Sequence, residues 1–347
     1  MKLLIYSDPH FCANSSLIKS RGSKYSTRLE NQIQTLNWIE EIAIKEKCDK
    51  IICLGDFFDK PDLTSEELTA INDVNWSTVP HTFLVGNHEM GSQDLVYNSA
   101  NVLSKIGSII TKPEIEVGYD YEIMYLPYIL EDNKKPIQEY YKELVKDTFT
   151  TQEVKERIIF SHNDIKGIRF GQYESKRGFD LEEITNFCSL FVNGHLHNGE
   201  WINNKVLNLG NVTGLNFSED ATKYKHCIMI LDTNDISNPS YIINPYAFNF
   251  YKLDVNSIEE LQSKLSYIET NNNIGSIKVP EDIIDEAREL CKHKFKELRL
   301  LLKPNLKVEN NVQIDAIAKA DHISQFKDYI LENIENSDIL QEELSLL

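Results

Sequence analysis

Five short polar clusters, each directly following an apolar run, constrain this chain more than any other feature of its sequence. The runs at 2–7, 51–54 and 82–85 are rich in β-forming residues and stop at an acid, at Gly-Asp or at Gly-Asn, as strands that end in loops do. In chain order the clusters are Asp8-Pro9-His10, Gly55-Asp56-Phe57-Phe58-Asp59, Gly86-Asn87-His88-Glu89, Ser161-His162-Asn163 and Gly194-His195-Leu196-His197. A single cluster of this kind is usually a polar turn, but five in succession indicate a shared chemical role.

The segments between the clusters predict an α/β fold. Residues 28–46 place apolar side chains at helical spacing, so the first part of the chain is expected to form a β-loop-α-β unit. Further strands are expected at 122–127, 157–161, 190–193, 206–209 and 226–232. Segment 238–246 carries two Pro and two Asn, which predicts a linker after a first domain at 1–240.

The pattern changes after that segment. Strands at 248–255, 275–279 and 298–302 alternate with helices at 257–268 and 280–294, which predicts a small β-α-β-α-β domain at 247–303. The remaining residues, 305–347, are acidic and are expected to form a helical tail with one apolar stripe. The stripe consists of Ile323, Phe326, Ile330 and Ile334.

The charge balance limits which partners the chain can bind. There are 36 Lys and Arg against 54 Asp and Glu, a net charge of −18, which disfavours autonomous nucleic-acid binding through a basic surface. Two local stretches, one after the first cluster and one after the fourth, are basic instead. They supply the candidate substrate-binding residues Arg21, Lys24, Arg28, Lys166, Arg169, Lys176 and Arg177. The alternative reading of these residues is solvated loop charge.

Cysteine usage and hydropathy bear on the compartment. The six Cys never form a C-x-x-C pair and show no framework spacing, as expected of thiols in a reducing compartment. No stretch approaches the roughly 18 uncharged apolar residues that a membrane span needs. The apolar run at the start of the chain is too short for a signal-peptide core. We therefore expect a cytoplasmic protein without a membrane partner.

The residue types in the clusters suit a divalent metal. Imidazole, carboxylate and amide oxygen together are ligands for borderline-hard ions such as Mn, Fe or Zn. The pairs Asp8 with His10 and His195 with His197 can each turn toward one ion at the end of a strand. A carboxylate at Asp56 can bridge two ions, and two ions can clamp both the attacking hydroxide and a phosphate. The Gly residues before Asp56, Asn87 and His195 allow tight turns there.

Taken together, the five motifs resemble those of the calcineurin-like metallophosphoesterase superfamily, over residues 1 to about 235. The resemblance implies a four-layer αββα sandwich with a small α+β capping domain and two divalent ions, most often Mn²⁺. It further implies that His88 is an unliganded acid at the leaving oxygen and that Glu89 orients His88. The implied ligands are Asp8, His10, Asp56 and His197 around one ion, and Asp56, Asn87, His162 and His195 around the other.

Within that superfamily the chain is most similar to the SbcD-type nuclease subunit of bacteria and phages. The similarity lies in the added small domain, the tail and the sequence Met124-Tyr125-Leu126-Pro127-Tyr128. It implies a DNA exonuclease and endonuclease of repair and recombination, a homodimer, and an SbcC-like ATPase partner bound by the tail. One position departs from that subfamily, whose second motif often reads G-D-x-x-H, because this chain has Asp59.

Two other functions compete with the nuclease. The chain can instead be a small-substrate phosphodiesterase or protein phosphatase, in which the extra domain gates access. A catalytically idle scaffold is disfavoured, since every metal-motif position is intact. Asp59 either contacts the site or solvates its loop, and Asn163 and Asp164 are read as turn formers.

Overall fold

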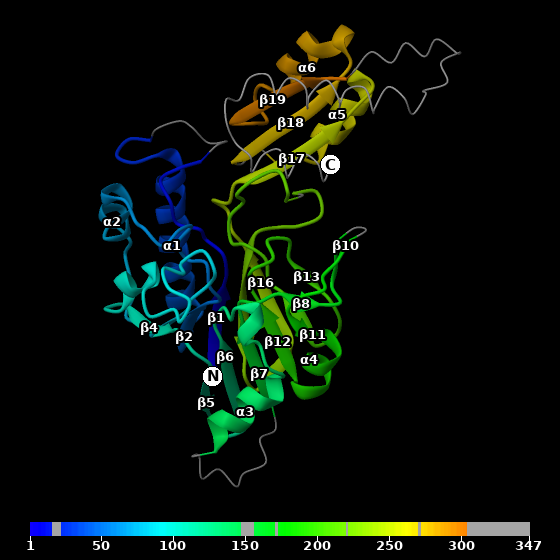
Figure 1. The fold of residues 1–347 in the computed structure, drawn as a ribbon. Coiled ribbons are helices and arrows are strands. Elements are labelled where there is room, and N and C mark those ends of the chain that lie inside the picture. The colour runs from blue at the N-terminus through cyan, green and yellow to red at the C-terminus, as the bar shows by residue number, and fades with distance from the viewer. Residues whose placement is uncertain (16–21, 147–155, 171–172, 220, 270–271, 304–347) are drawn as a thin grey trace, which may run out of the picture. The chain divides into compact units, whose positions relative to one another are not determined.

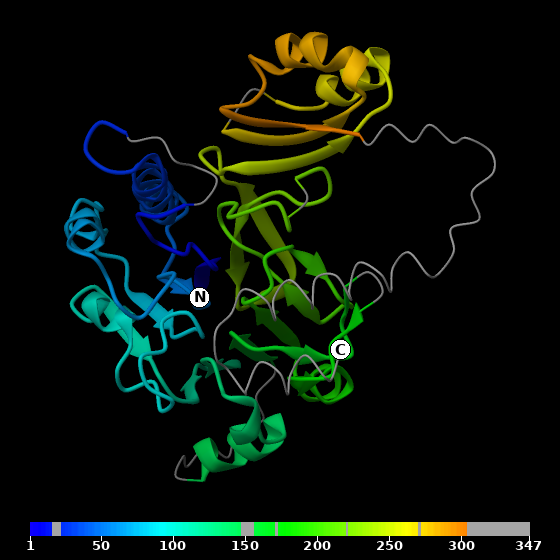
Figure 2. The same cartoon turned by 45° about the horizontal axis from the view of Figure 1, so that its top comes forward.

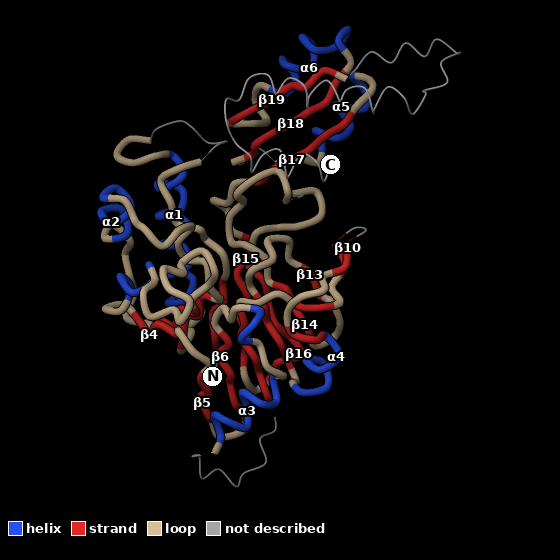
Figure 3. Tube along the Cα trace, viewed as in Figure 1, coloured by secondary structure: helices blue, strands red, loops and turns tan. Residues whose placement is uncertain are grey.

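The computed structural model describes residues 1–15, 22–146, 156–170, 173–219, 221–269 and 272–303. The predicted tail at 305–347 and the candidate substrate-binding residue Arg21 lie outside these residues. The described chain belongs to one compact unit, Met1–Lys303, built on two six-stranded sheets and a separate three-stranded sheet. Figure 3 shows the strands of the two larger sheets in red, with helices beside them.

The first large sheet has the strand order β16-β15-β1-β2-β3-β4. Strands β1 to β4 run parallel, while β15 and β16 are antiparallel additions at one edge. The bounds are β1 (Lys2–Tyr6), β2 (Lys50–Cys53), β3 (His81–Leu84), β4 (Gly107–Ile110), β15 (Cys227–Asp232) and β16 (Asp235–Ile243). The predicted strands at 2–7, 51–54, 82–85 and 226–232 are thus confirmed to within one residue at each end.

The second large sheet has the order β13-β14-β12-β7-β6-β5. Its four central strands are parallel, and its two edge strands are antiparallel to their neighbours. The bounds are β5 (Glu114–Val117), β6 (Tyr121–Leu126), β7 (Glu156–Ser161), β12 (Leu190–Asn193), β13 (Glu200–Trp201) and β14 (Val206–Asn208). All four parallel strands were predicted, but the two short edge strands carry too few apolar residues to be visible in the sequence.

Alternation along the strands explains how the layers pack. In β1, Leu3 and Ile5 face the second sheet, whereas Leu4 and Tyr6 face helices on the outside. Helices α1 (Thr27–Lys45) and α2 (Ser65–Ile71) cover the outer face of the first sheet, and α3 (Ile137–Val145) and α4 (Leu181–Phe187) cover that of the second (Figure 1). The result is the predicted four-layer αββα sandwich.

Local signals set the helix starts. The Ser26 hydroxyl accepts the Leu29 N–H and caps α1, while Thr64 and Glu67 form a reciprocal capping box on α2. Short elements complete the loops: the 3-10 turns η1 (Ser99–Leu103) and η2 (Glu131–Asn133), and the two-residue strands β8 (Ile165–Lys166), β9 (Arg169–Phe170), β10 (Tyr173–Glu174) and β11 (Phe179–Asp180). None of the described helices has both the length and the apolar character needed to cross a membrane.

The prediction of a linker at 238–246 is wrong for most of that segment. Strand β16 reaches Ile243 and pairs with β15, with Ile242 opposite Ile228. Pro239 is tolerated because β16 is an edge strand, where the missing N–H removes no ladder bond that the sheet requires. The Pro and Asn content of the segment therefore reflects an edge strand and the turn after it.

The three-stranded sheet follows the predicted β-α-β-α-β order. Its parallel strands are β17 (Asn249–Asp254), β18 (Asn273–Val279) and β19 (Glu297–Leu302), connected by α5 (Ile258–Ser266) and by η3 (Glu281–Ile283) with α6 (Ile284–Cys291). Both helices lie on one face of the sheet, as Figure 2 shows. Leu261, Ile277 and Cys291 are fully buried in a core of its own. The domain boundaries 1–240 and 247–303 stay predictions.

Candidate metal centre

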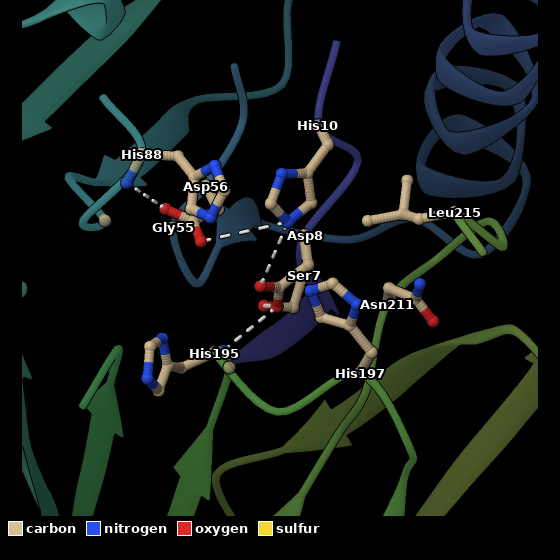
Figure 4. Close-up of polar contacts among 12 residues, drawn as sticks. Ser7, Asp8, His10, Gly55, Asp56, His88, His195, His197, Asn211 and Leu215 are labelled. Atoms are coloured by element: carbon tan, nitrogen blue, oxygen red, sulfur yellow. Dashed lines mark hydrogen bonds and ion pairs between the residues drawn. The ribbon is translucent and has the colours of Figure 1, made fainter. Parts of the chain in front are cut away.

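The five polar clusters meet at one edge of the sandwich. Each follows the carboxyl end of a parallel strand: β1, β2, β3, β7 and β12. Three groups of side chains result, within each of which the potential ligand atoms lie within 4.8 Å of one another, and the third, His10, Asp56 and His88, shares a residue with each of the other two. The first group is Asp8, His10 and His197, and the second group is Asp56, His162 and His195. The structure thus brings together side chains that the sequence separates by up to about half the chain, as Figure 4 shows for Asp8, Asp56 and His195.

Asp56 lies between the two groups. Its Oδ2 is 3.8 Å from His10 Nε2 and 3.1 Å from His162 Nε2, while its Oδ1 accepts the His88 N–H at 2.9 Å. Burial alone would raise the pKa of this carboxyl, but the His162 and His10 rings hold the pKa well below its usual value. A carboxylate that faces both groups is placed to bridge two cations.

Several polar atoms of the edge are buried without a hydrogen-bond partner. They are Asp8 Oδ1, His10 Nε2, Asn87 Oδ1, His195 Nδ1 and His162 Nε2, the last of which lies 3.1 Å from Asp56 Oδ2 without hydrogen-bond geometry. An unsatisfied buried polar atom costs about 1–3 kcal/mol, so five in one place call for a common ligand. All five are lone-pair donors of the kind that divalent cations accept, and the residues therefore fit a pair of metal ions.

The opposite nitrogen of each ligand His is already held. His10 Nδ1 lies 2.9 Å from Asp59 Oδ1, and His162 Nδ1 donates to the Leu54 carbonyl at 2.9 Å. His195 Nε2 lies 3.3 Å from Asp164 Oδ1, and His197 Nδ1 lies 3.2 Å from Glu219 Oε1. Such partners fix the ring orientation and leave the other nitrogen for the metal, which is the usual arrangement around metal-bound His.

Two of these partners are not predicted by the sequence. The pattern around Asp164 is that of a turn former, although this residue stands only two positions after His162. Glu219 lies 22 residues beyond His197 in an irregular loop, and no local pattern connects the two. Asp59, for which two readings were open, contacts the site through His10.

The backbone at the edge is strained. Four non-Gly residues adopt left-handed φ values: Asp8 at 51°, His10 at 44°, Asp56 at 47° and His195 at 71°. Gly55 has a φ of 120°, which residues with a side chain rarely adopt. Gly86 is required for a different reason, the lack of space for a side chain. A Cβ on Gly86 would lie 2.1 Å from Asp56 Oδ1, so this glycine makes room for the bridging carboxylate.

A sequence model of the calcineurin-like phosphoesterases matches residues 1–237. The chain belongs to the calcineurin-like phosphoesterase family. It is accordingly a metal-dependent phosphoester hydrolase, and its clustered His and Asp side chains are the candidate metal-binding residues. No curated protein matches the chain in sequence.

Solved structures of similar fold include three that cover much of this phosphoesterase. TT1561 of Thermus thermophilus is 12% identical, with a TM-score of 0.42 over 70% of this chain and 98% of that one. A dimetal phosphatase from Danio rerio is 12% identical, with a TM-score of 0.41 over 70% and 99%. A purple acid phosphatase from yellow lupin (Lupinus luteus) seeds is 16% identical, with a TM-score of 0.39 over 58% and 38%.

His88 stands at the open side of the phosphoesterase centre. Its side chain is 42% exposed, its ring centroid is 4.6 Å from that of His10, and its Nδ1 lies 3.0 Å from the Asp59 carbonyl. His88 is also within ligand reach of His10 and Asp56, so its assignment as the unliganded acid stays a prediction. Asp59, whose carboxylate is 3.6 Å from His88 Nδ1, is the acid beside this ring.

Glu89 does not orient His88 as the sequence suggested. Its buried carboxylate accepts the N–H groups of Gly86 at 2.7 Å and Phe58 at 3.2 Å. Burial, together with the charge of Asp56, raises the pKa of Glu89 to about 8. Glu89 thus links the second motif to the third through hydrogen bonds. Asp59, not Glu89, is the acid next to His88, because the loop that carries Asp59 runs past this ring.

The candidate substrate-binding residues fall into different environments. Arg28 is buried, donates to the His10 carbonyl and to Cys12 Sγ, and so supports the first motif instead of facing solvent. Lys24 is exposed but pairs with Asp73 at 2.6 Å. Lys166, Lys176 and Arg177 are exposed near the fourth motif, and of Arg169 only the backbone in β9 is described.

Proposed function

We propose that this phosphoesterase is a two-metal-dependent DNA nuclease, acting as exonuclease and endonuclease in repair or recombination with Mn²⁺ as its metal. The observation that carries the proposal is a metal edge that opens to the surface and is flanked by cations and an aromatic ring. When bound, two divalent ions activate water and polarise the phosphate oxygens.

The openness of the edge suits a long substrate. The side chains of His88 and Asp59 are 42% and 43% exposed, although the ligands Asp8, His10 and His162 beneath them are buried. A phosphate that reaches the ligands therefore lies near the surface, with room for the chain on either side of it. A site for one small ester would more typically enclose its substrate.

The flank beside His195 favours a polyanion. The Tyr128 ring lies 6.2 Å from that of His195, and Lys134 Nζ, which is largely buried and also pairs with Glu131 at 2.9 Å, lies 6.0 Å from the Tyr128 centroid. The hydrogen bond with His195 lowers the pKa of Asp164, and the positive charges of Lys134 and Arg177 lower it further. Cations and an aromatic face beside the centre of a chain with net charge −18 support local binding of a nucleic acid strand.

The protein residues have separate tasks in the proposed reaction. Asp56 and the four His ligands hold the centre, with their outer nitrogens fixed as described above. His88, exposed above the ligands, is placed to stabilise or protonate the leaving oxygen of the cut strand. Asp59 keeps the His88 ring over the edge through its carbonyl contact with Nδ1.

The test is digestion of linear DNA by the purified full chain with Mn²⁺, beside hydrolysis of a chromogenic phosphodiester. The nuclease proposal predicts that DNA is cleaved, that chelation abolishes cleavage, and that Asp56→Asn is inactive under the same conditions. Hydrolysis of the chromogenic ester without cleavage of single- or double-stranded DNA would contradict it.

One observation favours the second candidate, a small-substrate phosphodiesterase or protein phosphatase. Asp59 takes the position where the nuclease subfamily often has His, and it contacts both His10 and His88. A carboxylate there lowers the positive charge available to a diester strand. Comparing a phosphomonoester, a small phosphodiester and DNA at equal enzyme concentration separates these functions by their relative kcat/KM.

We further propose an SbcC-like ATPase partner, which the tail would bind, and a homodimer. The stripe of Ile323, Phe326, Ile330 and Ile334 lies outside the described residues, so its support is the sequence pattern alone. Phe326→Asp with Ile330→Asp in the full chain should prevent co-purification with the ATPase while hydrolysis of a small phosphodiester is unchanged. Retention of the ATPase by this variant would remove the stripe from the interface.

A further inference from the structure

A loop that follows the last motif connects the metal centre to the three-stranded sheet. We define the strap as residues 214–219 together with Ala221. At its start, the Gly214 N–H donates to the Phe248 carbonyl at 3.1 Å. At its end, the Ala221 N–H donates to the Phe250 carbonyl at 3.2 Å. Both ends of the strap are therefore hydrogen-bonded to the chain at the beginning of β17.

Apolar contacts fix the strap to the same sheet. The Phe217 ring packs edge-to-face on that of Phe250, with centroids 5.2 Å apart. Ala221 is 2% exposed and belongs to the core cluster of the three-stranded sheet, beside Tyr251 and Leu253. The position of the strap thus depends on the packing of that sheet.

The other side of the strap carries a buried carboxylate that reaches the metal centre. Glu219 is 3% exposed, and its Oε1 lies 3.2 Å from His197 Nδ1 and 2.9 Å from Asn211 Nδ2. Its Oε2 accepts the N–H of Leu215, within the strap, at 3.0 Å. Figure 4 shows Asn211 beside His197. The carboxylate is held by three donors, one of which is a metal ligand.

We propose that Glu219 is a positioning residue that couples the three-stranded sheet to one of the two metal ions through His197. With Nδ1 of His197 donating to Glu219, its Nε2 is directed to the group that contains Asp8 and His10. In the second group, His195 is held by Asp164 and His162 by the Leu54 carbonyl, not by Glu219. Ligand binding to the three-stranded sheet, or distortion of this sheet, therefore changes the affinity for one metal ion and leaves the affinity for the other unchanged.

This coupling rests on the two-metal centre of the proposed function, but not on DNA as the substrate. Mn²⁺ binding to the full chain measures it directly, by titration calorimetry and by metal content after dialysis. The parent should bind two ions. Glu219→Gln, which keeps the shape of the side chain and removes its charge, should weaken one of them about 10- to 100-fold and leave the other at the parent affinity.

A matched control is available on the same sandwich. Glu40 is also buried and also pairs with a His ring, since its Oε1 lies 2.8 Å from His81 Nε2, but His81 begins β3 at the end opposite to the metal edge. Glu40→Gln should lower thermal stability and leave both ions bound. Circular dichroism on each variant verifies that the chain is folded before its metal binding is compared.

The sheet end of the coupling is tested with Phe217→Ala, which removes the ring contact with Phe250 and touches no ligand. It should weaken the same single ion as Glu219→Gln, by about threefold to tenfold, the range expected for one aromatic pair. The hydrolysis rate of both variants on a small phosphodiester should return toward the parent rate as Mn²⁺ is raised, with KM unchanged.

Three results would overturn the proposal. Parent affinity for both ions in Glu219→Gln, or equal weakening of both, would show that Glu219 does not position His197. Parent affinity in Phe217→Ala, with one ion weakened in Glu219→Gln, would disprove the link to the sheet. By contrast, a parent chain that binds two ions but leaves DNA intact refutes only the nuclease, because none of these measurements uses DNA.

Discussion

The metal edge and the three-stranded sheet, both parts of one compact unit, are built in opposite ways. The edge has four non-Gly residues in the left-handed region and five buried polar atoms without partners. Among described residues 249–303 there is no left-handed residue and no unpaired buried side-chain atom. Of the described residues, the edge therefore holds four of the six left-handed non-Gly residues and five of the nine unpaired buried side-chain atoms, at a place where bound cations can compensate them.

The sheet, in turn, combines a packed apolar core with satisfied hydrogen bonds. Leu261, Ile277, Ala287 and Cys291 are all fully buried in its core, and its helix α5 is capped by Ser257, whose hydroxyl accepts the Glu260 N–H. The stability of the three-stranded sheet does not depend on bound metal. The ligand atoms of the metal edge, by contrast, are expected to lack partners until metal binds. Changes to the two regions should therefore separate metal binding from folding.

The change with the largest expected effect is Asp56→Asn. It removes the charge of a side chain that faces both ligand groups, so we expect loss of bound metal and a fall in activity of about 10³-fold or more. Elemental analysis and hydrolysis of a chromogenic phosphodiester measure the two effects. A variant that keeps both ions would show that Asp56 is not the bridge.

Next is His88→Ala, which tests whether the exposed ring is a ligand or an acid. Removal of a general acid costs about 10²- to 10⁴-fold in rate, and both ions should stay bound, because the ring lies above ligands that have their own partners. Metal content and kcat are compared with the parent. If the variant lost an ion, His88 would be a ligand, as its distance to His10 and Asp56 also permits.

The same contrast explains what could be predicted from the sequence. The ligands were predictable because each follows its own strand, so local pattern and function coincide at Asp8, Asp56 and His162. The partners of these side chains could not be predicted, because Glu219 is distant from His197 in the sequence and the two come into contact only when the chain is folded. Arg28 appeared as a surface cation, since burial of a single polar residue on a helix leaves no trace in the sequence.

The three-stranded sheet was predictable for another reason. Its strands and helices alternate in short regular segments with apolar periodicity, and no strained turn interrupts them. Strand β16 was missed because an edge strand needs few apolar residues and tolerates Pro239. Sequence patterns therefore identified the packed sheet and the side chains that meet at the metal edge, but not the contacts that join distant loops.

A third prediction addresses the packed region. Ile277→Ala removes a fully buried side chain from the centre of β18, which should lower the free energy of unfolding by about 2–5 kcal/mol. The ion at the second group should bind as in the parent, because His195 and His162 are held by Asp164 and the Leu54 carbonyl and not by Glu219 of the strap. Denaturant unfolding and Mn²⁺ titration measure the two quantities, and Tyr267→Ala, an 84% exposed position on the same unit, is the control.

A smaller effect is expected from Asp59→Asn. The amide can keep a hydrogen bond to His10 Nδ1 but loses the charge that holds this ring and its neighbour His88. Loss of such a partner typically costs about 10- to 100-fold in metal affinity or activity. Mn²⁺ titration and kcat are the measurements. Parent values in both would mean that Asp59 only solvates its loop.

The smallest effect concerns the exposed cations after the fourth motif. Replacing Lys166, Lys176 and Arg177 by Ala should weaken DNA cleavage a few-fold and flatten its salt dependence, by a slope of about 0.9 for each phosphate that the variant no longer neutralises. Small phosphodiesters do not reach these cations and should be hydrolysed at the parent rate. The matched control is Lys45, Lys105 and Lys146, which are exposed near the opposite ends of the strands.

The salt slope distinguishes the nuclease from its competitor more sharply than the rate does. If the three cations contact the phosphates of a DNA strand, the salt slope of cleavage changes only in their triple variant and only with DNA as the substrate. The reason is that counterion release depends on the phosphates that the protein neutralises. If they are ordinary loop charges, the two triple variants behave alike on every substrate. In that case the substrate of the open metal edge would be a small phosphoester and not a polyanion. The position of Asp59 beside His88 would then favour the phosphatase.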